Sequence, residues 1–191
     1  MGVRTFVAID LSDAAGGAVR AWLRRMSACG ANVRWVDGSS WHLTLKFLGD
    51  VAESRLWDIA KCVGLAVEAT EPFEVELIGA GAFPQRERPR TLWLGIGDGK
   101  ESVIDLAGKI ETGLISAGFR PEGRVFHPHL TIGRVRDGQQ IERLAEGLEQ
   151  AQDVSWGRFS VQEVLVLSSE LRQAGPVYTQ VACCELAGGA R

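Results

Sequence analysis

Two short stretches of sequence decide the fold: residues 42–45 read HLTL, and residues 129–132 read HLTI. The second copy follows the first after 87 positions, which is close to half of the 191-residue chain. Each copy begins a run of β-branched and apolar residues that predicts a β-strand. A short repeat at this spacing suggests a duplication, so we expect two lobes that present equivalent strands to a shared cleft.

The histidines and threonines of the two copies are candidate catalytic residues. Side chains two positions apart in a strand point to the same face, so His42 projects with Thr44 and His129 projects with Thr131. An imidazole, whose ordinary pKa is about 6.5, serves as acid or base at neutral pH, and a hydroxyl donates a hydrogen bond to a phosphate oxygen. Two copies that face one another therefore supply a base, an acid and two hydrogen-bond donors around one phosphate.

Chance is a poor explanation of this pair of motifs. One His-x-Thr segment alone is most often an ordinary half-buried part of a strand. The chain has three His and seven Thr, and shuffling places Thr two positions after at least two of the histidines in roughly four of a thousand chains. The repeat is therefore interpreted as a functional site.

The other segments predict a mixture of strands and helices. Strands are expected at 3–9, 33–37, 43–48, 73–83, 90–96, 130–135, 159–167 and 177–184, and helices at about 13–29, 53–70, 101–117 and 139–150. Ser12 or Asp13 is the expected N-cap of the first helix, and Gly30 its expected end. Several connections between strands are too short for a parallel crossover, so the predicted fold class is α+β with mainly antiparallel sheet. We expect a single domain over residues 1–191, with a tail that is frayed from about residue 186.

Composition and charge exclude several classes of protein. The 46% hydrophobic and 24% charged residues are typical of a globular chain. The net charge of -3 argues against binding of long duplexes, which requires many cationic contacts with phosphates. The four cysteines show no C-x₂-C spacing, so we expect reduced thiols and no metal. Because no segment is typical of a signal peptide or a membrane span, we expect a soluble, cytoplasmic protein. A monomer is the default expectation.

Further segments carry a resemblance that covers nearly the whole chain, to about residue 184. They are 5–10 (TFVAID), 34–36 (RWV), 41–49 (WHLTLKFLG), 83–84 (FP), 89–94 (PRTLWL), 126–135 (FHPHLTIGRV) and 175–178 (GPVY). Together with the paired motifs, they resemble the 2H phosphoesterase superfamily and, within it, the bacterial and archaeal RNA 2′,3′-cyclic phosphodiesterases, also called 2′-5′ RNA ligases. The resemblance implies two pseudo-symmetric lobes of antiparallel sheet plus helices around a central cleft.

The same resemblance implies a reaction. RNA 2′,3′-cyclic phosphate ends would be hydrolysed to 2′-phosphomonoesters without a metal or a cofactor, and the reverse reaction with a 5′-hydroxyl end would be a ligation. We assign His42 as the proton donor to the departing 3′ oxygen and His129 as the proton acceptor that activates water. Thr44 and Thr131 would stabilise the charged oxygens. The expected partners are RNA 3′ ends or small cyclic-phosphate nucleotides.

Three features outside the motifs are candidates for substrate binding. The family pattern has an arginine at Arg134 near the phosphate, although a regular strand would turn this residue away from Thr131 unless a bulge or a twist intervenes. Phe47 either stacks a nucleobase or packs in the core. The arginine cluster within residues 86–90 either guides an RNA strand or forms a solvated loop.

Other functions stay open on the sequence. His127 and His129 are spaced like a pair of metal ligands, but a metal-dependent hydrolase would also need a carboxylate, and the next position on the same face is Thr131. A non-catalytic module that binds RNA ends or phosphate would use the histidines only as contacts. A cyclic nucleotide or an ADP-ribose cyclic phosphate would present the same reacting group as an RNA end.

Overall fold

The computed structural model describes residues 2–11, 16–172 and 175–188. The strands in these ranges are β1 (Gly2–Asp10), β2 (Val33–Trp35), β3 (His42–Ala52), β4 (Phe73–Phe83), β5 (Thr91–Ile96), β6 (His129–Val135), β7 (Ser155–Val161), β8 (Glu163–Arg172) and β9 (Gly175–Glu185). The helices are α1 (Gly17–Ser27), α2 (Leu56–Val67), α3 (Lys100–Ser116) and α4 (Ile141–Glu149), with two 3₁₀ turns, η1 (Gly38–Ser40) and η2 (Glu53–Arg55).

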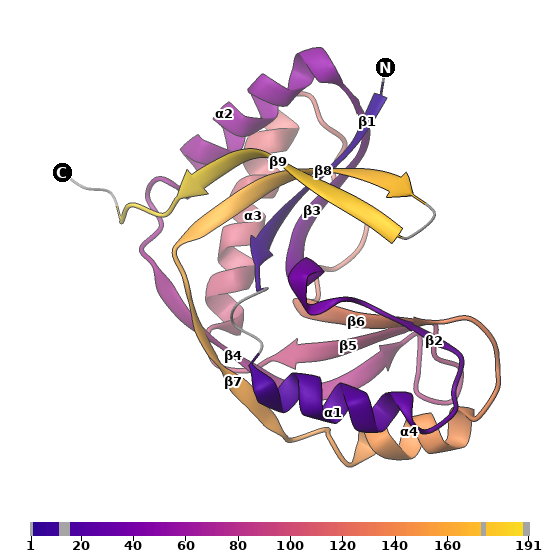
Figure 1. Ribbon diagram of the computed structural model, residues 1–191. Helices are drawn as coiled ribbons and strands as arrows, with labels where there is room; N and C mark the ends of the chain where they lie inside the picture. The colour runs from indigo at the N-terminus through magenta and orange to yellow at the C-terminus, as the bar shows by residue number, and fades with distance from the viewer. Residues whose placement is uncertain (1, 12–15, 173–174, 189–191) are drawn as a thin grey trace.

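The strands of the described ranges form one antiparallel sheet. The order across the sheet is β7-β4-β5-β6-β3-β1-β8-β9, and β2 pairs with β6 beside this path. Strands β3 and β6, which carry the two motifs, are therefore neighbours at the centre. Figure 1 shows that the sheet is strongly curved, so that the half with β8 and β9 lies across from the half with β5 and β6.

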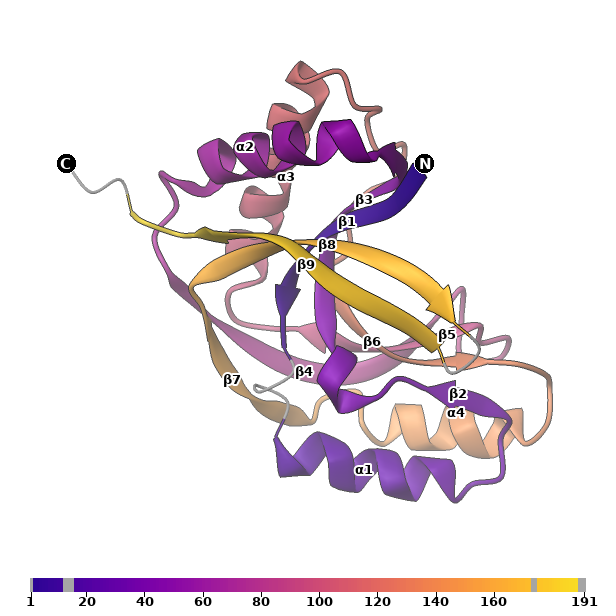
Figure 2. The same cartoon turned by 45° about the horizontal axis from the view of Figure 1, so that its top comes forward.

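The two halves of the sheet have equivalent parts. One half consists of β3, β1, β8 and β9 and is covered by α2 and α3, which contact strands of this half (Figures 1 and 2). The other half consists of β6, β5, β4 and β7 and is covered by α1 and α4. The rings of Trp22 on α1 and Trp156 on β7 lie 5.0 Å apart and join that helix to its half. The predicted α+β fold with two pseudo-symmetric lobes is therefore confirmed.

Aliphatic side chains fill the space between each half of the sheet and its helices. On α3 the buried residues recur at spacings of three and four: Val103, Leu106, Ala107, Ile110 and Leu114. On β5, Leu92 and Leu94 are buried at alternate positions, as a strand covered on one face requires. Each such fully buried leucine contributes roughly 1.5–3 kcal/mol relative to an exposed one, so this layer holds the motif strands in place.

The structure differs from the sequence prediction at two strands. The expected strand 159–167 is divided into β7 and β8 at Gln162, because β7 pairs with β4 whereas β8 pairs with β1 in the other half. The expected strand 33–37 is reduced to β2, which pairs with β6 rather than with β3. Residues 38–40 form a 3₁₀ turn between β2 and β3.

The first helix begins later than the sequence indicates. Its first residue is Gly17, and the expected caps Ser12 and Asp13 lie outside the described residues. Gly30, two positions after the C-cap, has a φ of 84°, a left-handed conformation that glycine adopts easily after a helix. In the part of the chain that is described, none of the helices is long and apolar enough to cross a bilayer.

The C-terminal tail is packed further than expected. Leu186 is buried in the core, and the Gly188 amide donates a hydrogen bond of 3.1 Å to the Thr70 carbonyl. The expectation of fraying from about residue 186 is thus wrong for residues 186–188. Residues 189–191 lie outside the described ranges.

Candidate active site

The two motifs meet at one cross-strand pair. Leu43 of β3 lies directly opposite Leu130 of β6, and both side chains are fully buried. Because neighbouring residues of a strand point to opposite faces, the His and Thr side chains of both motifs share the other face. Extending the antiparallel register by one residue places His42 towards Thr131 and His129 towards Thr44. The structure thus brings together the four residues that the sequence selected.

A β-bulge occurs at the same place in both motifs. The register between β1 and β3 skips Leu45, and the register between β5 and β6 skips Ile132. Each skipped residue directly follows the motif threonine. An extra residue moves every later side chain to the opposite face, so Phe47 and Arg134 return to the face of the histidines. The conflict between the family pattern and a regular strand at Arg134 is resolved by this bulge.

Burial follows the bulge in both strands. In both strands, the two residues directly after the motif threonine are buried, and the residue that follows them is exposed. In β3 the second of the two is Lys46, which the bulge turns to the covered face of the sheet. Its Nζ atom lies 2.7 Å from a Glu111 carboxylate oxygen on α3 and donates to the Arg120 carbonyl. These partners compensate the cost of burying an ammonium group.

Backbone carbonyls orient both imidazoles in the same way. His42 Nδ1 lies 2.8 Å from the Ser40 carbonyl oxygen, and His129 Nδ1 lies 2.7 Å from the His127 carbonyl oxygen. A carbonyl oxygen only accepts a hydrogen bond, so each Nδ1 carries a proton. Proton exchange with a substrate is therefore left to Nε2 in each ring. The carbonyl that orients each imidazole belongs to the residue two positions before the motif histidine, and the sequence analysis did not identify this contact.

Aromatic rings pack against the two imidazoles. The His42 ring lies 5.0 Å from Phe6 and 5.1 Å from Tyr178, with an interplanar angle of 84° to the tyrosine. The His129 ring lies 5.0 Å from Phe83, also at 84°. Burial among such neighbours disfavours the charged form and lowers the pKa of both histidines. The sequence analysis missed the contacts of these rings, which come from β1, β9 and β4.

The electrostatic surroundings of the two histidines differ. Asp10 of β1 lies directly opposite His42, whereas the residue opposite His129 in β5 is Gly95. Burial lowers the pKa of His42, whereas the hydrogen bond to the Ser40 carbonyl and the charge of Asp10 raise it. For His129, burial likewise lowers the pKa and the hydrogen bond to the His127 carbonyl raises it, whereas the charges of His127 and Arg134 lower it further. Sequence reasoning did not identify Asp10 as part of the site.

Arginine side chains gather near the second motif and Tyr178. Arg134 is exposed, and its register partner in the neighbouring strand β2 is Arg34. Burial raises the pKa of the Tyr178 phenol, and the charges of Arg134, Arg34 and Arg4 act in the opposite direction. The Arg4 guanidinium also lies 4.8 Å from the centroid of the Phe47 ring. A cationic surface therefore borders the histidines on a chain whose net charge is negative.

Phe47 is 44% exposed, so the alternative that it packs in the core is wrong. Since Arg4 occupies one side of its ring, a base would use the rest of the ring surface. The arginine cluster within residues 86–90 lies in the loop after Phe83, the residue that contacts His129. Its role in guiding RNA stays a prediction.

A metal site has little support around His127 and His129. Among the residues that the structure describes, no group of three or more metal-ligating side chains is found. The hydrogen bond between this pair runs from the His129 ring to the backbone of His127.

Comparison with known proteins connects this arrangement to a family. A family model described as the 2′-5′ RNA ligase superfamily matches residues 17–173. The chain belongs to this superfamily. An RNA 2′,3′-cyclic phosphodiesterase of Methanothermobacter thermautotrophicus is 38% identical over 181 residues, which cover 95% of this chain and 97% of the relative. Another from Aeropyrum pernix is 35% identical over 149 residues, covering 78% and 84%. The resemblance inferred from the sequence is thus confirmed.

Solved structures share the fold of this 2′-5′ RNA ligase superfamily member. The TT0787 protein of Thermus thermophilus has a TM-score of 0.77 and 25% identity, covering 97% of this chain and 98% of its own. The LigT protein of E. coli, in a crystal structure with 3′-AMP, has a TM-score of 0.73 and 24% identity, covering 97% and 99%. The curved sheet with two lobes is therefore a property of known proteins of this kind.

Proposed function

We propose that this protein hydrolyses RNA 2′,3′-cyclic phosphate ends to 2′-phosphomonoesters. The observation that carries the proposal is the Leu43–Leu130 pair, which aligns two His-x-Thr strands so that both Nε2 atoms are available on one face. Relatives at up to 38% identity are named RNA 2′,3′-cyclic phosphodiesterases, which supports the same substrate class here.

The reaction follows from one base and one acid. Water attacks phosphorus in line with the bond to the 3′ oxygen, and His129 Nε2 accepts a proton from that water. The bond between phosphorus and the 3′ oxygen breaks, and His42 Nε2 donates a proton to the departing oxygen. The phosphate stays on the 2′ oxygen. Each proton transfer of this type contributes about 10²–10⁴-fold to the rate.

Local charge supports this assignment of roles. Asp10, opposite His42, favours the protonated imidazole that an acid needs. The charges of His127 and Arg134 favour the neutral imidazole of His129 that a base needs. Proton transfer in the opposite sense, with a 5′-hydroxyl end in place of water, would give the ligase reaction.

The remaining site residues bind the substrate in this proposal. Thr44 and Thr131 donate hydrogen bonds to the non-bridging oxygens, and Arg134 offsets their charge. Phe47 stacks the terminal base. The mechanism uses no metal and no cofactor, and RNA 3′ ends or small cyclic-phosphate nucleotides are the partners. The four cysteines are unpaired, which fits the reducing cytoplasm, and we propose that the protein acts as a monomer.

The test is hydrolysis of 2′,3′-cyclic mononucleotides and of an oligonucleotide with a 2′,3′-cyclic phosphate end, in excess EDTA. Wild type should release 2′-phosphate products, and His42→Ala and His129→Ala should each lose at least about 10²-fold in kcat. Turnover that requires added metal would contradict the mechanism. Tight binding of RNA ends without turnover in the wild type would instead indicate a binding module.

A further inference from the structure

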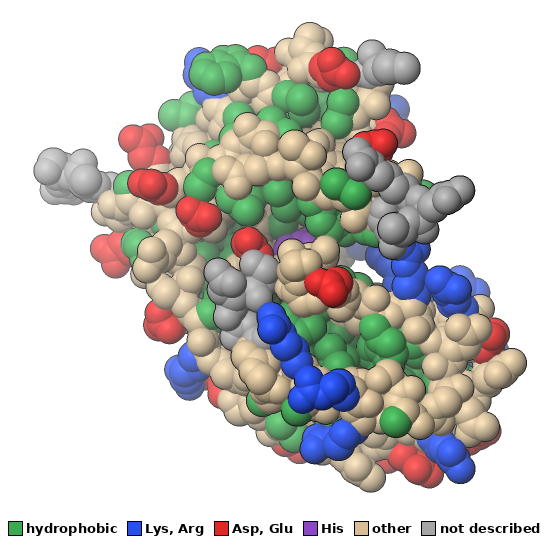
Figure 3. Space-filling model, viewed as in Figure 1, with side chains coloured by type: hydrophobic (Ala, Val, Ile, Leu, Met, Phe, Trp, Pro, Cys, Tyr) green, Lys and Arg blue, Asp and Glu red, His purple; other side chains and the backbone are tan. Residues whose placement is uncertain are grey.

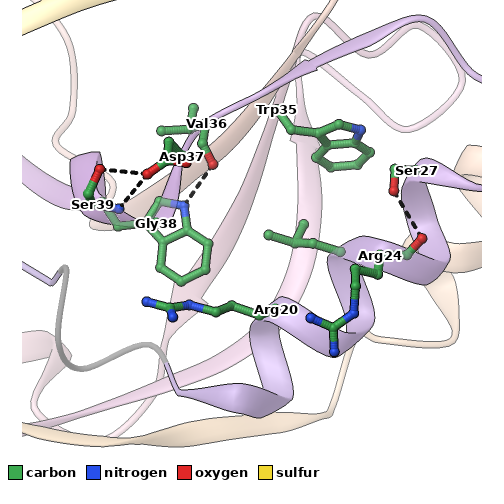
Figure 4. A pocket seen from close by; sticks show the side chains of 10 residues that line it. Arg20, Arg24, Ser27, Trp35, Val36, Asp37, Gly38 and Ser39 are labelled. Atoms are coloured by element: carbon green, nitrogen blue, oxygen red, sulfur yellow. Dashed lines mark hydrogen bonds between the residues drawn. The ribbon is translucent and has the colours of Figure 1, made fainter.

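A groove of about 780 Å³ lies beside the active site, between α1 and the segment that leads into β3. One wall is the face of α1 with Arg20, Leu23, Arg24 and Ser27, and the other wall runs from Trp35 through Ser39 (Figure 4). Trp41 lines the groove as well. Neither catalytic histidine lines it, so the groove is separate from the site described above.

Arg20 lies near Trp41 and Gly38 in the groove. Its guanidinium carbon lies 5.9 Å from the centroid of the Trp41 ring, and Trp41 is only 1% exposed, with its indole N–H donating to the Val36 carbonyl. A Cβ atom added to Gly38 would lie 3.4 Å from the Arg20 guanidinium. The exposed Arg20 side chain therefore lies near the buried indole and near η1, which places its charge at this end of the groove.

The groove combines cationic and aromatic side chains. Figure 4 shows Arg24 and the indole of Trp35 on opposite walls. Asp37 also lines the groove, but its carboxylate accepts a hydrogen bond of 2.9 Å from the Ser39 amide. Two guanidinium groups against one carboxylate leave the groove cationic. Proteins that bind single-stranded RNA combine a cationic groove with rings on which bases stack.

A single turn of chain separates this groove from His42. Gly38 and Ser39 line the groove, and the Ser40 carbonyl that follows them orients the His42 imidazole. At about 2 Å per residue, this three-residue 3₁₀ turn is about 6 Å long. In Figure 3, a purple histidine is visible at the centre of the same face on which blue basic side chains lie over α1, with green apolar surface in the hollow beside them.

We propose that this groove binds the nucleotide that precedes the cyclic-phosphate end of an RNA strand. The guanidinium groups of Arg20 and Arg24 contact its phosphates, and Trp35 contacts its base. The inference rests on the proposed function and narrows it, because it makes an RNA strand, rather than a cyclic mononucleotide, the better substrate.

The test compares two substrates that share the same reacting group: a 2′,3′-cyclic mononucleotide and a trinucleotide with a 2′,3′-cyclic phosphate end. In the variant Arg20→Ala/Arg24→Ala, kcat/KM for the trinucleotide should fall about tenfold or more, while kcat/KM for the mononucleotide should not change. Arg25→Ala is the matched control, because Arg25 lies on the same helix but lines a different hollow with Arg143 and Glu146. It should leave both substrates unaffected.

Three outcomes would overturn the proposal. They are an equal loss on both substrates, no loss on the trinucleotide, and a loss that occurs only when Arg86 and Arg88 of the β4–β5 loop are replaced. If the wild type hydrolyses neither substrate, the proposed function is contradicted. The role of the groove in RNA binding is then tested by affinity measurements alone. A trinucleotide with a 2′-phosphate end should then bind more tightly than a 2′-mononucleotide, with the difference lost in the double variant. Equal affinity for the two would contradict the groove.

Discussion

Leu43 lies directly opposite Leu130, and this pair joins the two halves of the sheet at the point where both motifs begin. Because each leucine precedes a motif threonine and follows a motif histidine, the pair sets how the four polar side chains face one another. In the proposed mechanism, an apolar pair on the covered face of the sheet thus aligns the reacting groups on the open face.

Replacing either leucine should therefore affect stability and activity together. Leu43→Ala or Leu130→Ala should lower the free energy of unfolding by about 2–5 kcal/mol, because each side chain is fully buried. The double variant should lose less than the sum of the single losses, since residues in contact are coupled. Denaturant unfolding measures both effects. Leu65→Ala is the control: at 64% exposure, it should change stability by no more than about 0.5 kcal/mol.

Removing the charge of Asp10 should change the pH profile at its alkaline limb. Asp10 raises the pKa of His42, so Asp10→Asn should lower that pKa. His42 must be protonated to donate, and activity is lost as pH rises through its pKa. The alkaline limb of the kcat profile should therefore move to lower pH. A shift of the acidic limb instead would mean that His42 is the base.

Arg134 should act on the other limb. Its charge lowers the pKa of His129, so Arg134→Gln should raise that pKa. His129 must be neutral to accept a proton, and activity is lost as pH falls through its pKa. We expect the acidic limb of the kcat profile to move to higher pH, measured with a saturating cyclic nucleotide. An acidic limb that stays in place would argue against His129 as the base.

Phe47→Ala should weaken substrate binding without weakening the fold. The ring is 44% exposed, and loss of a stacked base costs about 1–3 kcal/mol, so KM should rise while the thermal midpoint stays constant. Phe47→Tyr should keep a normal KM because it retains the ring. Trp57→Ala removes a ring that is 77% exposed on α2 and serves as the control. An equal rise in KM in the control would contradict a specific role of Phe47.

Tyr178 is expected to position His42 through its ring rather than through its hydroxyl. The ring meets the imidazole at 84° and 5.1 Å, so Tyr178→Phe should keep kcat near the wild-type value, whereas Tyr178→Ala should lower it. Kinetics at saturating substrate, together with the pH profile of each variant, distinguishes the two. If Tyr178→Phe loses as much as Tyr178→Ala, the hydroxyl itself takes part in the reaction.

Much of this molecule could be predicted from local pattern. The repeat of HLTL and HLTI indicated two equivalent strands, and the periods of two and 3.6 residues indicated most strands and helices. These signals are short-range, because side-chain alternation and helix ends depend on residues only a few positions apart. The two motif histidines could be selected as candidate site residues because the His-x-Thr spacing is also a short-range pattern.

Other features depended on which strands became neighbours. No local pattern states that β2 pairs with β6, that β7 and β8 belong to opposite halves, or that Asp10 comes to lie opposite His42. The bulges after Thr44 and Thr131 also exist only relative to a partner strand.

The sequence by itself determined the candidate reacting groups and the class of fold, because these follow from residue types and short periods. The tertiary structure decided that Arg134 and Phe47 lie on the face of the motif histidines, that the two imidazoles differ in charge environment, and that a cationic groove lies one turn of chain away from His42. The physical reason is that pairing between distant segments is selected by burial of the whole core, and electrostatic contacts depend on the distances that this pairing produces.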